Sequence, residues 1–223
     1  MNRKITFAEG EYYHIYNRGV EKRDVFLDEK DYQRFQKLLF FANGTQPIVY
    51  KLVQGLTLDK VELKETLVHI GAYVLMPNHF HILVQAKNDN SLSEFMQKLT
   101  TGYTMYFNKK YKRVGPLFQG AFKAEHVDRD EYLKYLFAYI HLNPVKMIDA
   151  LWKENGITDP LRTKKYLQEY TYSSYDDWMG KEREANLILS KTEFPEYFGD
   201  QNEFDNYIND WLVIQGLTLD RII

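Results

Sequence analysis

Two apolar stretches separated by one tight turn constrain the fold of this chain most strongly. Residues 66–76 and 79–86 are rich in β-branched and aromatic residues, and Met76-Pro77-Asn78 lies between them. Runs of this composition favour β-strands, and strands joined by so short a turn pair antiparallel. We therefore predict an antiparallel hairpin of central strands, around which the rest of the fold is organised.

The second of these strands carries two histidines. In "HFHILVQA", His79 and His81 stand two residues apart. They therefore project from one face of the strand, while Phe80 and Ile82 enter the core on the other. Two neighbouring imidazoles can share one divalent cation. Two ligands make an incomplete site, so either the remaining ligands lie elsewhere in the chain or the histidines are incidental polar residues.

The remaining sequence alternates between strand-like and helix-like patterns. The order strand, helix, two strands, helix, strand, helix predicts an α+β class, an antiparallel β-sheet flanked by α-helices. Residues 46–64 fit a hairpin or a helix and stay open. The other expected elements are a strand at 11–17, a helix at 28–43 capped by Asp28 or Asp31, a helix at 92–111 capped by Ser91, a strand at 117–127 and a helix at 128–142.

Charge divides the chain into two parts. Residues 1–146 hold 21 Lys and Arg against 16 Asp and Glu, whereas residues 147–223 hold 8 against 15. The second part also changes to short helical patterns. We expect a catalytic domain at 1–147 and an acidic, mainly helical C-terminal extension at 148–223 that packs on it.

The most basic segment, residues 95–124, has six basic side chains and no acidic one. Cations interleaved with aromatic rings suit a surface that follows phosphates and stacks bases. The alternative is a solvated helix end followed by core aromatics. The first interpretation makes DNA-binding residues of Lys109, Lys110, Lys112 and Arg113.

Composition excludes several kinds of chemistry and location. The chain has no cysteine, so disulfides, thiolate metal sites and cysteine nucleophiles are ruled out. No apolar stretch approaches the roughly 20 residues that span a bilayer. The N-terminus lacks the apolar region of a secretory signal. We expect a cytoplasmic protein without a membrane partner.

The predicted helix before Asn143-Pro144 carries a candidate nucleophile. In "YLFAYIHLNPVK", Tyr139 and Asn143 stand four residues apart and share one helical face. The phenol oxygen of Tyr139 can act as a nucleophile, and Asn143 offers a carbonyl oxygen as a ligand. His141 points to a different side of the helix. Taken alone, an asparagine before a proline is simply a helix end.

Both motifs together resemble a known family. "YVLMPNHFHILV", followed about 60 residues later by "YIHLNPVK", is similar to the single-tyrosine transposases of the HUH endonuclease superfamily. These include the enzymes of the smallest insertion sequences and the REP-associated tyrosine transposases. "YHIYNRG", "GPLFQGAFKA" and "YSSYDDWMG" resemble them too, although Ala121 stands where members often have arginine.

The resemblance implies a ferredoxin-like or RRM-like core and a reaction on single-stranded or hairpin DNA. It implies that His79, His81 and Asn143 bind Mg²⁺ or Mn²⁺ and that Tyr139 forms a 5′-phosphotyrosine intermediate before strands rejoin. Arg18 and Lys123 lie in similar stretches and are expected DNA-binding residues. A homodimer stays open. The alternatives are a replication-initiator or relaxase-type nickase and a non-catalytic nucleic-acid-binding module.

Overall fold

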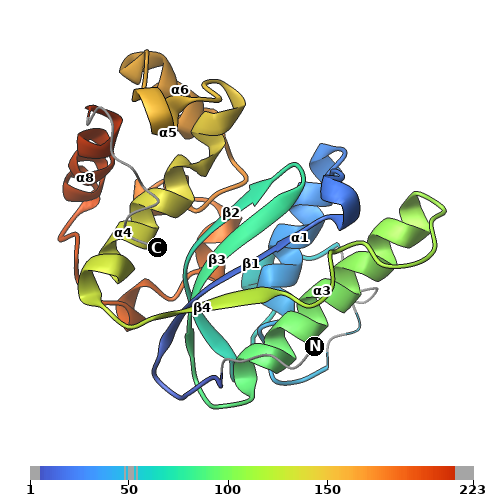
Figure 1. The fold of residues 1–223 in the computed structure, drawn as a ribbon. Coiled ribbons are helices and arrows are strands. Elements are labelled where there is room, and N and C mark those ends of the chain that lie inside the picture. The colour runs from blue at the N-terminus through green and yellow to red at the C-terminus, as the bar shows by residue number, and fades with distance from the viewer. Residues whose placement is uncertain (1–5, 48, 50–52, 54, 214–223) are drawn as a thin grey trace.

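A four-stranded antiparallel sheet lies at the centre of the molecule, with strand order β2-β3-β1-β4. The computed structural model describes residues 6–47, 49, 53 and 55–213. The predicted α+β class is confirmed (Figure 1). The strands are β1 (Tyr12–Arg18), β2 (Val68–Met76), β3 (His79–Ala86) and β4 (Lys123–Val127).

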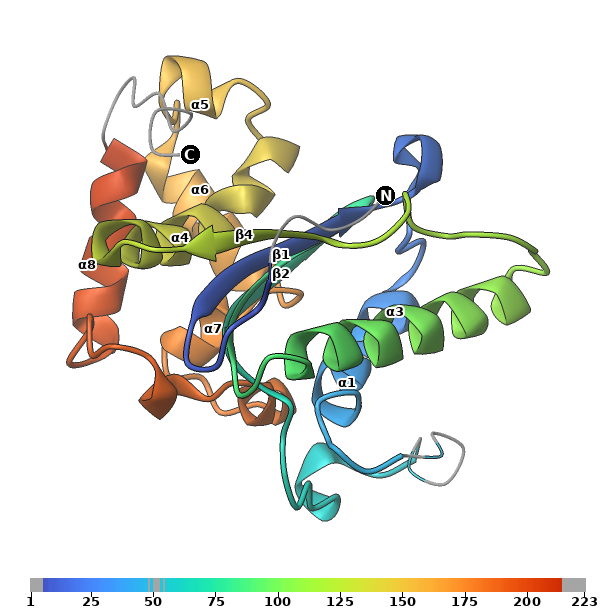
Figure 2. The same cartoon turned by 60° about the horizontal axis from the view of Figure 1, so that its bottom comes forward.

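Helices cover both faces of the sheet. Figure 2 shows α1 and α3 on one side, and α4 with α5, α6 and α8 on the other. The helices are α1 (Glu29–Phe41), α3 (Ser91–Lys110), α4 (Asp130–Leu142), α5 (Trp152–Asn155), α6 (Pro160–Glu169), α7 (Tyr175–Trp178) and α8 (Gln201–Val213). Single 3-10 turns occupy Val20–Lys22, Leu58–Lys60, Asn143–Met147, Glu184–Ile188 and Lys191–Glu193.

The predicted hairpin is confirmed, and its register places the two histidines. His79 pairs with Met76 and His81 pairs with Val74 across the β2–β3 ladder. Because side chains alternate along a strand, Phe80 and Ile82 point the other way. Both are fully buried in the core between the sheet, α1 and α3. The histidines face α4 instead.

A second core fills the space between the sheet and α4. Its strand residues include Val74 and Leu83, and its helical residues include Leu133, Phe137 and Phe204 of α8. Since both faces of the sheet are covered, β2 is apolar along almost its whole length rather than alternating. The polar histidines therefore stand out in an otherwise apolar layer.

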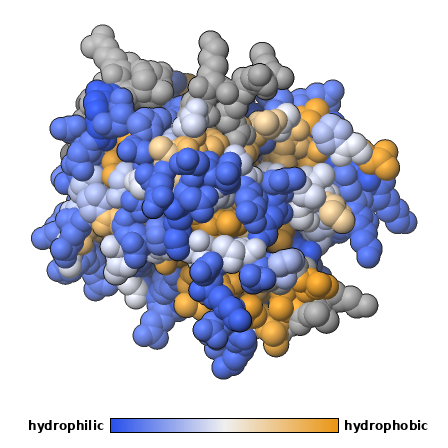
Figure 3. Space-filling view, turned by 90° about the horizontal axis from the view of Figure 1, so that it is seen from below, coloured by the Kyte–Doolittle hydropathy of each residue, from blue (hydrophilic) through white to orange (hydrophobic). Residues whose placement is uncertain are grey.

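Most of the tyrosines serve as packing residues. Figure 3 shows a face of the molecule that is largely hydrophilic, with hydrophobic residues in separate patches. The aromatic side chains of the basic segment are buried in the first core or packed against it, which favours the interpretation as core aromatics. The buried tyrosines are Tyr13, Tyr32, Tyr73, Tyr103, Tyr132, Tyr135, Tyr170 and Tyr175.

The start of α1 agrees with expectation, whereas the start of α3 differs by one residue. Asp28 is the N-cap of α1, and Asp31 completes a capping box with it. Ser91 was expected to cap α3, but it is the first helical residue and Asn90 occupies the cap position. The Ser91 hydroxyl instead accepts hydrogen bonds from the backbone N–H groups of Lys87 and Asn88, which close the turn before the helix.

The strand predicted at 117–127 is shorter than expected. Within this segment, Phe118 makes only an isolated bridge to Gly19, and the ladder with β1 begins at Lys123. Gly120 adopts a φ of 73°, a left-handed conformation that interrupts an extended strand. Residues 46–64, left open from the sequence, contain a 3-10 turn at Leu58–Lys60, and part of this range lies outside the described residues.

The C-terminal extension covers the outer edge of β2. Leu75 N–H donates to the Tyr172 carbonyl and Ser174 N–H donates to the Tyr73 carbonyl, both at 2.9 Å. The Trp178 indole N–H donates to the Gly71 carbonyl at 3.0 Å. An uncovered edge of this length would present unpaired backbone groups to other chains. The extension thus completes the sheet, while the domain division at residue 147 stays a prediction.

A buried ion pair holds this segment in place. Asp177 is fully buried, and Arg183 donates to its carboxylate through Nε at 2.7 Å and through Nη2. The same guanidinium donates to the carbonyl oxygens of Thr171 and Ser173. Arg183 therefore ties the turn after α7 to the residues that border β2.

Removing the arginine should destabilise the whole fold. In Arg183→Met, the Asp177 carboxylate would stay buried without its partner, so we expect the free energy of unfolding to fall by about 3–5 kcal/mol. Urea denaturation measures it. The control is Lys165→Met, which removes an exposed i,i+4 pair with Glu169 and should cost under about 1 kcal/mol. Equal losses in the two variants would contradict a clamping role for Arg183.

Candidate catalytic site

Side chains from β3 and the end of α4 meet over one face of the sheet. The rings of His79 and His81 lie 5.1 Å apart between centroids, and the ring of Tyr139 stands 5.4 Å from His81 at 90°. Asn143 follows α4 directly, and its side chain interacts with the His79 imidazole. The four residues singled out in the sequence are therefore neighbours.

Hydrogen bonds orient the atoms of this group. His79 Nδ1 lies 2.6 Å from Asn78 Oδ1, and Asn78 Nδ2 donates to the Lys22 carbonyl at 3.1 Å. Since that amide presents its oxygen, His79 donates from Nδ1 and keeps a lone pair on Nε2. Asn143 Nδ2 donates to the Tyr139 carbonyl at 2.9 Å, so its Oδ1 is the atom of this amide that could serve as a ligand.

These donors suit a divalent cation. Two imidazole nitrogens and one amide oxygen offer three ligands, and positions would remain for phosphate oxygens. Within the described part of the chain, no three His, Cys, Asp or Glu side chains gather as a metal site. The candidate set here is two histidines and an asparagine, and it matches the ligands that the resemblance implies.

The histidines are held in the neutral form that ligation requires. Burial lowers the pKa of His79 to about 4, and the charges of Arg18 and Lys146 add to the effect. Burial also lowers the pKa of His81, with a further contribution from His14. A neutral imidazole keeps the lone pair that a metal needs, and no proton has to be displaced at neutral pH.

Positive side chains surround the site. Arg18 and Lys123, both expected from the sequence, are exposed and line a pocket of about 270 Å³ beside His79 and His81. Lys153 Nζ stands 4.7 Å from the centroid of the Tyr139 ring. Together with Lys146, these side chains form a cationic rim that suits a phosphate backbone.

Two of these cations were missed in the sequence. Lys146 ends the quoted "YIHLNPVK", so its position beside the candidate ligand Asn143 was a usable signal. Lys153 lies in the acidic extension, on α5, and only the tertiary fold brings it to Tyr139. His14 was also missed, although it stands in "YHIYNRG". Its Nε2 lies 2.8 Å from His81 Nδ1.

The basic end of α3 is partly engaged within the protein. Lys110 contacts the carboxylates of Asp28 and Asp31, each at 2.7 Å. Arg113 Nη1 donates to Asn108 Oδ1 at 3.0 Å. Lys109 and Lys112 are exposed. DNA binding by these four residues stays a prediction, and the carboxylates beside Lys110 make it the weakest of them for a phosphate.

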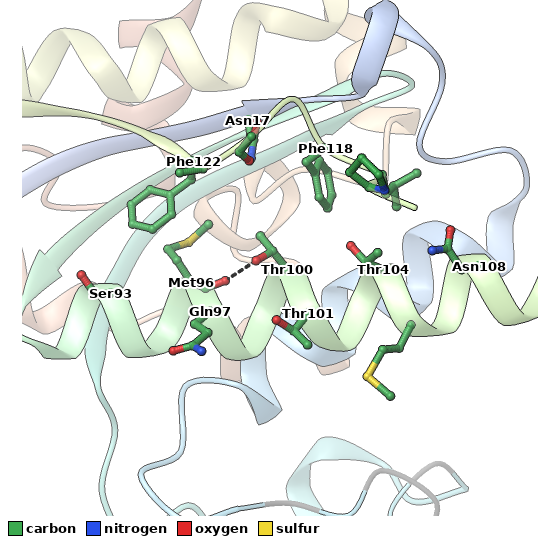
Figure 4. Close-up of a pocket in the computed structure, with 15 residues that line it drawn as sticks. Asn17, Ser93, Met96, Gln97, Thr100, Thr101, Thr104, Asn108, Phe118 and Phe122 are labelled. Carbon is green, nitrogen blue, oxygen red and sulfur yellow. Dashed lines mark hydrogen bonds between the residues drawn. The ribbon is translucent and has the colours of Figure 1, made fainter. Parts of the chain in front are cut away.

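A larger groove lies on the opposite face of the sheet. It has a volume of about 650 Å³ and runs between α3 and the segment before β4 (Figure 4). Hydroxyl and amide groups such as Thr100, Thr104 and Asn108 line it together with Phe118 and Phe122, and its lining contains no lysine or arginine. The smaller cationic pocket, rather than this groove, holds the candidate chemistry.

One protein family matches the part of the chain that carries the candidate site. Residues 57–143 match the family model described as "Transposase IS200 like". This segment of the chain is therefore similar to IS200-like transposases. The match includes His79, His81, Tyr139 and Asn143, and the resemblance noted in the sequence is confirmed. Among curated proteins, none matches the chain.

Two solved structures are similar to this chain, and the first of them shares its fold. One is described as the structure of the REP-associated tyrosine transposase bound to a REP hairpin. It has 14% sequence identity and a TM-score of 0.51, and the match covers 90% of this chain and 93% of that one. A bacterial tRNA(His) guanylyltransferase-like protein in complex with ATP has 11% identity and a TM-score of 0.40, over 95% and 94% of the two chains. Within the described residues, no helix is long and apolar enough to cross a membrane.

The carboxylate of Glu125, next to the candidate site, should change how the stability of the protein depends on pH in acid. Contact with His14 and a hydrogen bond from Tyr16 lower the pKa of Glu125 from 4.5 to about 2. The folded state therefore favours the carboxylate, and this stabilisation is complete above pH 4.5 and is lost as the pH falls toward 2. We expect the free energy of unfolding to fall less steeply below pH 4.5 in Glu125→Gln than in the wild type.

Urea titrations at several pH values between 3 and 6 measure this slope. Glu182→Gln is the matched control, because that side chain is exposed in the turn after α7. It should keep the slope of the wild type. Identical slopes in Glu125→Gln and the wild type would show that the carboxylate has the same pKa in the folded and unfolded chain.

Proposed function

We propose that this IS200-like transposase is a metal-dependent endonuclease and strand transferase for single-stranded DNA, with Tyr139 as its nucleophile. The position of Tyr139 over His79 and His81, with Asn143 on the next turn, carries the proposal. The family match supports a transposase. The neighbour that is described as bound to a REP hairpin supports hairpin DNA as the form recognised.

The proposed reaction begins with the phenol oxygen of Tyr139. Tyr139 Oη attacks the scissile phosphorus, a new P–O bond forms, and the bond from phosphorus to the 3′ oxygen breaks. The products are a 5′-phosphotyrosine and a 3′-hydroxyl that takes up a proton. A second 3′-hydroxyl can reverse the step and join strands. The ammonium of Lys153 beside the ring favours the phenolate over the phenol as the proton leaves.

His79, His81 and Asn143 would hold the metal ion. Bound Mg²⁺ or Mn²⁺ supplies a positive charge that polarises the phosphate and neutralises charge developing on its oxygens. Imidazole ligands alone also suit zinc, so the assignment of Mg²⁺ or Mn²⁺ rests on the family. Arg18, Lys123 and Lys146 would hold the flanking phosphates from the rim of the site.

The arrangement favours cleavage by a single chain. Tyr139 contacts His81 of its own chain, so a site built in cis needs no exchange of helices between subunits. A homodimer that shares tyrosines is the alternative. Within this chain we propose a catalytic domain at residues 1–147, completed by an extension at 148–223 that supplies Lys153.

A covalent adduct tests the nucleophile. Wild-type protein incubated with a labelled hairpin oligonucleotide and Mn²⁺ should form an adduct that survives denaturation, and EDTA should suppress it. Tyr139→Phe should abolish the adduct, at least 1000-fold, and retain DNA binding within about threefold, because only the attacking oxygen is lost. Gel electrophoresis and fluorescence anisotropy measure the two quantities.

The neighbouring Tyr135→Phe is the matched control, since Tyr135 lies one helical turn earlier, 5.9 Å from Tyr139 between ring centroids. It should keep the adduct. An adduct that persists in Tyr139→Phe would move the nucleophile elsewhere. Mixing Tyr139→Phe with His81→Ala should restore no adduct if the site works in cis, whereas recovered adduct would indicate tyrosines shared between subunits.

The salt dependence of binding tests the cationic rim. Arg18→Gln combined with Lys123→Gln should weaken DNA binding and reduce the slope of log K against log salt by about 1.4 on single-stranded DNA, since two phosphate contacts are lost. The comparison variant is Lys109→Gln with Lys112→Gln, which tests the end of α3 and leaves the ion-paired Lys110 intact. Anisotropy titrations from 50 to 300 mM salt measure both slopes. An unchanged slope would exclude the affected pair from phosphate contact.

A further inference from the structure

His14 stands directly behind the candidate ligand His81. It lies on β1, two residues before Tyr16, which pairs with His81, so both histidines project from the same face of the sheet. His14 is only 3% exposed, and its Nε2 lies 2.8 Å from His81 Nδ1. Two imidazole nitrogens at this distance share one proton, which must belong to one ring or the other.

The ring that carries this proton determines whether His81 can bind a metal. If His81 donates from Nδ1, its Nε2 keeps a lone pair and can ligate. If His14 donates, Nδ1 of His81 is the acceptor, and a neutral His81 carries its proton on Nε2, where it blocks ligation. The hydrogen bond is thus compatible with a working and a non-working form of the site.

The surroundings of the other ring nitrogen of His14, Nδ1, distinguish the two forms. Its Nδ1 is buried, and the nearest carboxylate oxygen, Glu125 Oε2, lies 3.7 Å away. A carboxylate only accepts hydrogen bonds, so it favours the His14 ring with its proton on Nδ1. That ring then has an unprotonated Nε2, which can only accept from His81.

Glu125 is itself fixed in this position. Tyr16 Oη donates to its Oε1 at 2.7 Å, and Tyr132 Oη donates to its Oε2 at 3.2 Å. The residues come from β1, α4 and β4, and all face the side of the sheet that carries His81. Two phenols that donate to the carboxylate leave it no role as a donor toward His14.

We propose that Glu125 and His14 form a relay of positioning residues that holds His81 in the tautomer with a proton on Nδ1 and presents its Nε2 to the metal. Asn78 does the same for His79 through its Oδ1. The proposal rests on the proposed function, because it assumes that His81 is a ligand. It adds two residues that touch neither metal nor DNA.

Nuclear magnetic resonance of the metal-free protein tests the tautomer directly. Long-range ¹H–¹⁵N spectra of the histidine rings separate protonated from unprotonated nitrogens. In the wild type at pH 7.5, we expect His81 with a proton on Nδ1 and a bare Nε2, and His14 in the same form. A wild-type His81 that carries its proton on Nε2 would overturn the proposal, whatever the activity of the enzyme.

Metal affinity provides the second measurement. We expect His14→Leu and Glu125→Gln to weaken Mn²⁺ binding by about 10- to 100-fold in calorimetric titrations, as for other residues that orient metal ligands. His14→Gln keeps a carbonyl acceptor for His81 Nδ1 and should recover most of the affinity. An equal loss in His14→Gln and His14→Leu would overturn the role of His14 as an acceptor.

A matched control variant and a test of metal binding by the wild type distinguish a failure of the relay from a failure of the proposed function. His126 on β4 pairs with Glu11 at 2.6 Å and is exposed, so His126→Leu removes a histidine–carboxylate contact away from His81 and should leave Mn²⁺ affinity unchanged. If the wild type binds Mn²⁺ and forms the adduct while Glu125→Gln and His14→Leu bind Mn²⁺ normally, the relay proposal is wrong and the proposed function stands. If the wild type binds no Mn²⁺ and His79→Ala behaves like it, the proposed function fails.

Discussion

Antiparallel pairing of β3 with a strand on each side determines which face of the sheet carries the two histidines. His81 pairs with Val74 of β2 and with Tyr16 of β1, so its register is defined twice. A slip of one residue would turn both imidazoles into the core against α1 and α3 and bring Phe80 to the other face. Phe80 and the other apolar residues of β3 therefore hold the register, and α4 contributes Tyr139 to the face that carries the histidines.

Local patterns in the sequence were sufficient for the elements that carry the candidate site. The hairpin, the paired histidines and the helix before Asn143-Pro144 each depend on residues close together in the chain, and the structure has them as expected. Ser91 and the start of β4 were wrong by a few residues. These boundaries depend on one turn and on one glycine in a left-handed conformation. The spacing of apolar residues in the sequence reveals neither.

Contacts between distant segments were beyond the sequence. His14 of β1 contacts His81 of the neighbouring strand β3, and Lys153 lies against Tyr139 although it belongs to an extension with a net negative charge. Charge counted along the chain was misleading for the same reason. Lys110 lies in the most basic segment but faces two carboxylates from α1. The cations that do surround the site come from four separate segments, and only folding assembles them.

The hydrogen bonds from Tyr172 and Ser174 to β2 have a consequence for biosynthesis. A ribosome makes the four strands and α4 long before it makes the residues that border the outer edge of the sheet and the arginine that secures them. During that interval the nascent chain exposes a long apolar edge strand, the feature through which sheets join one another. Synthesis that stops before the extension would thus release a chain whose sheet has an open, apolar edge, so the residues after 147 cover this edge as well as supplying Lys153.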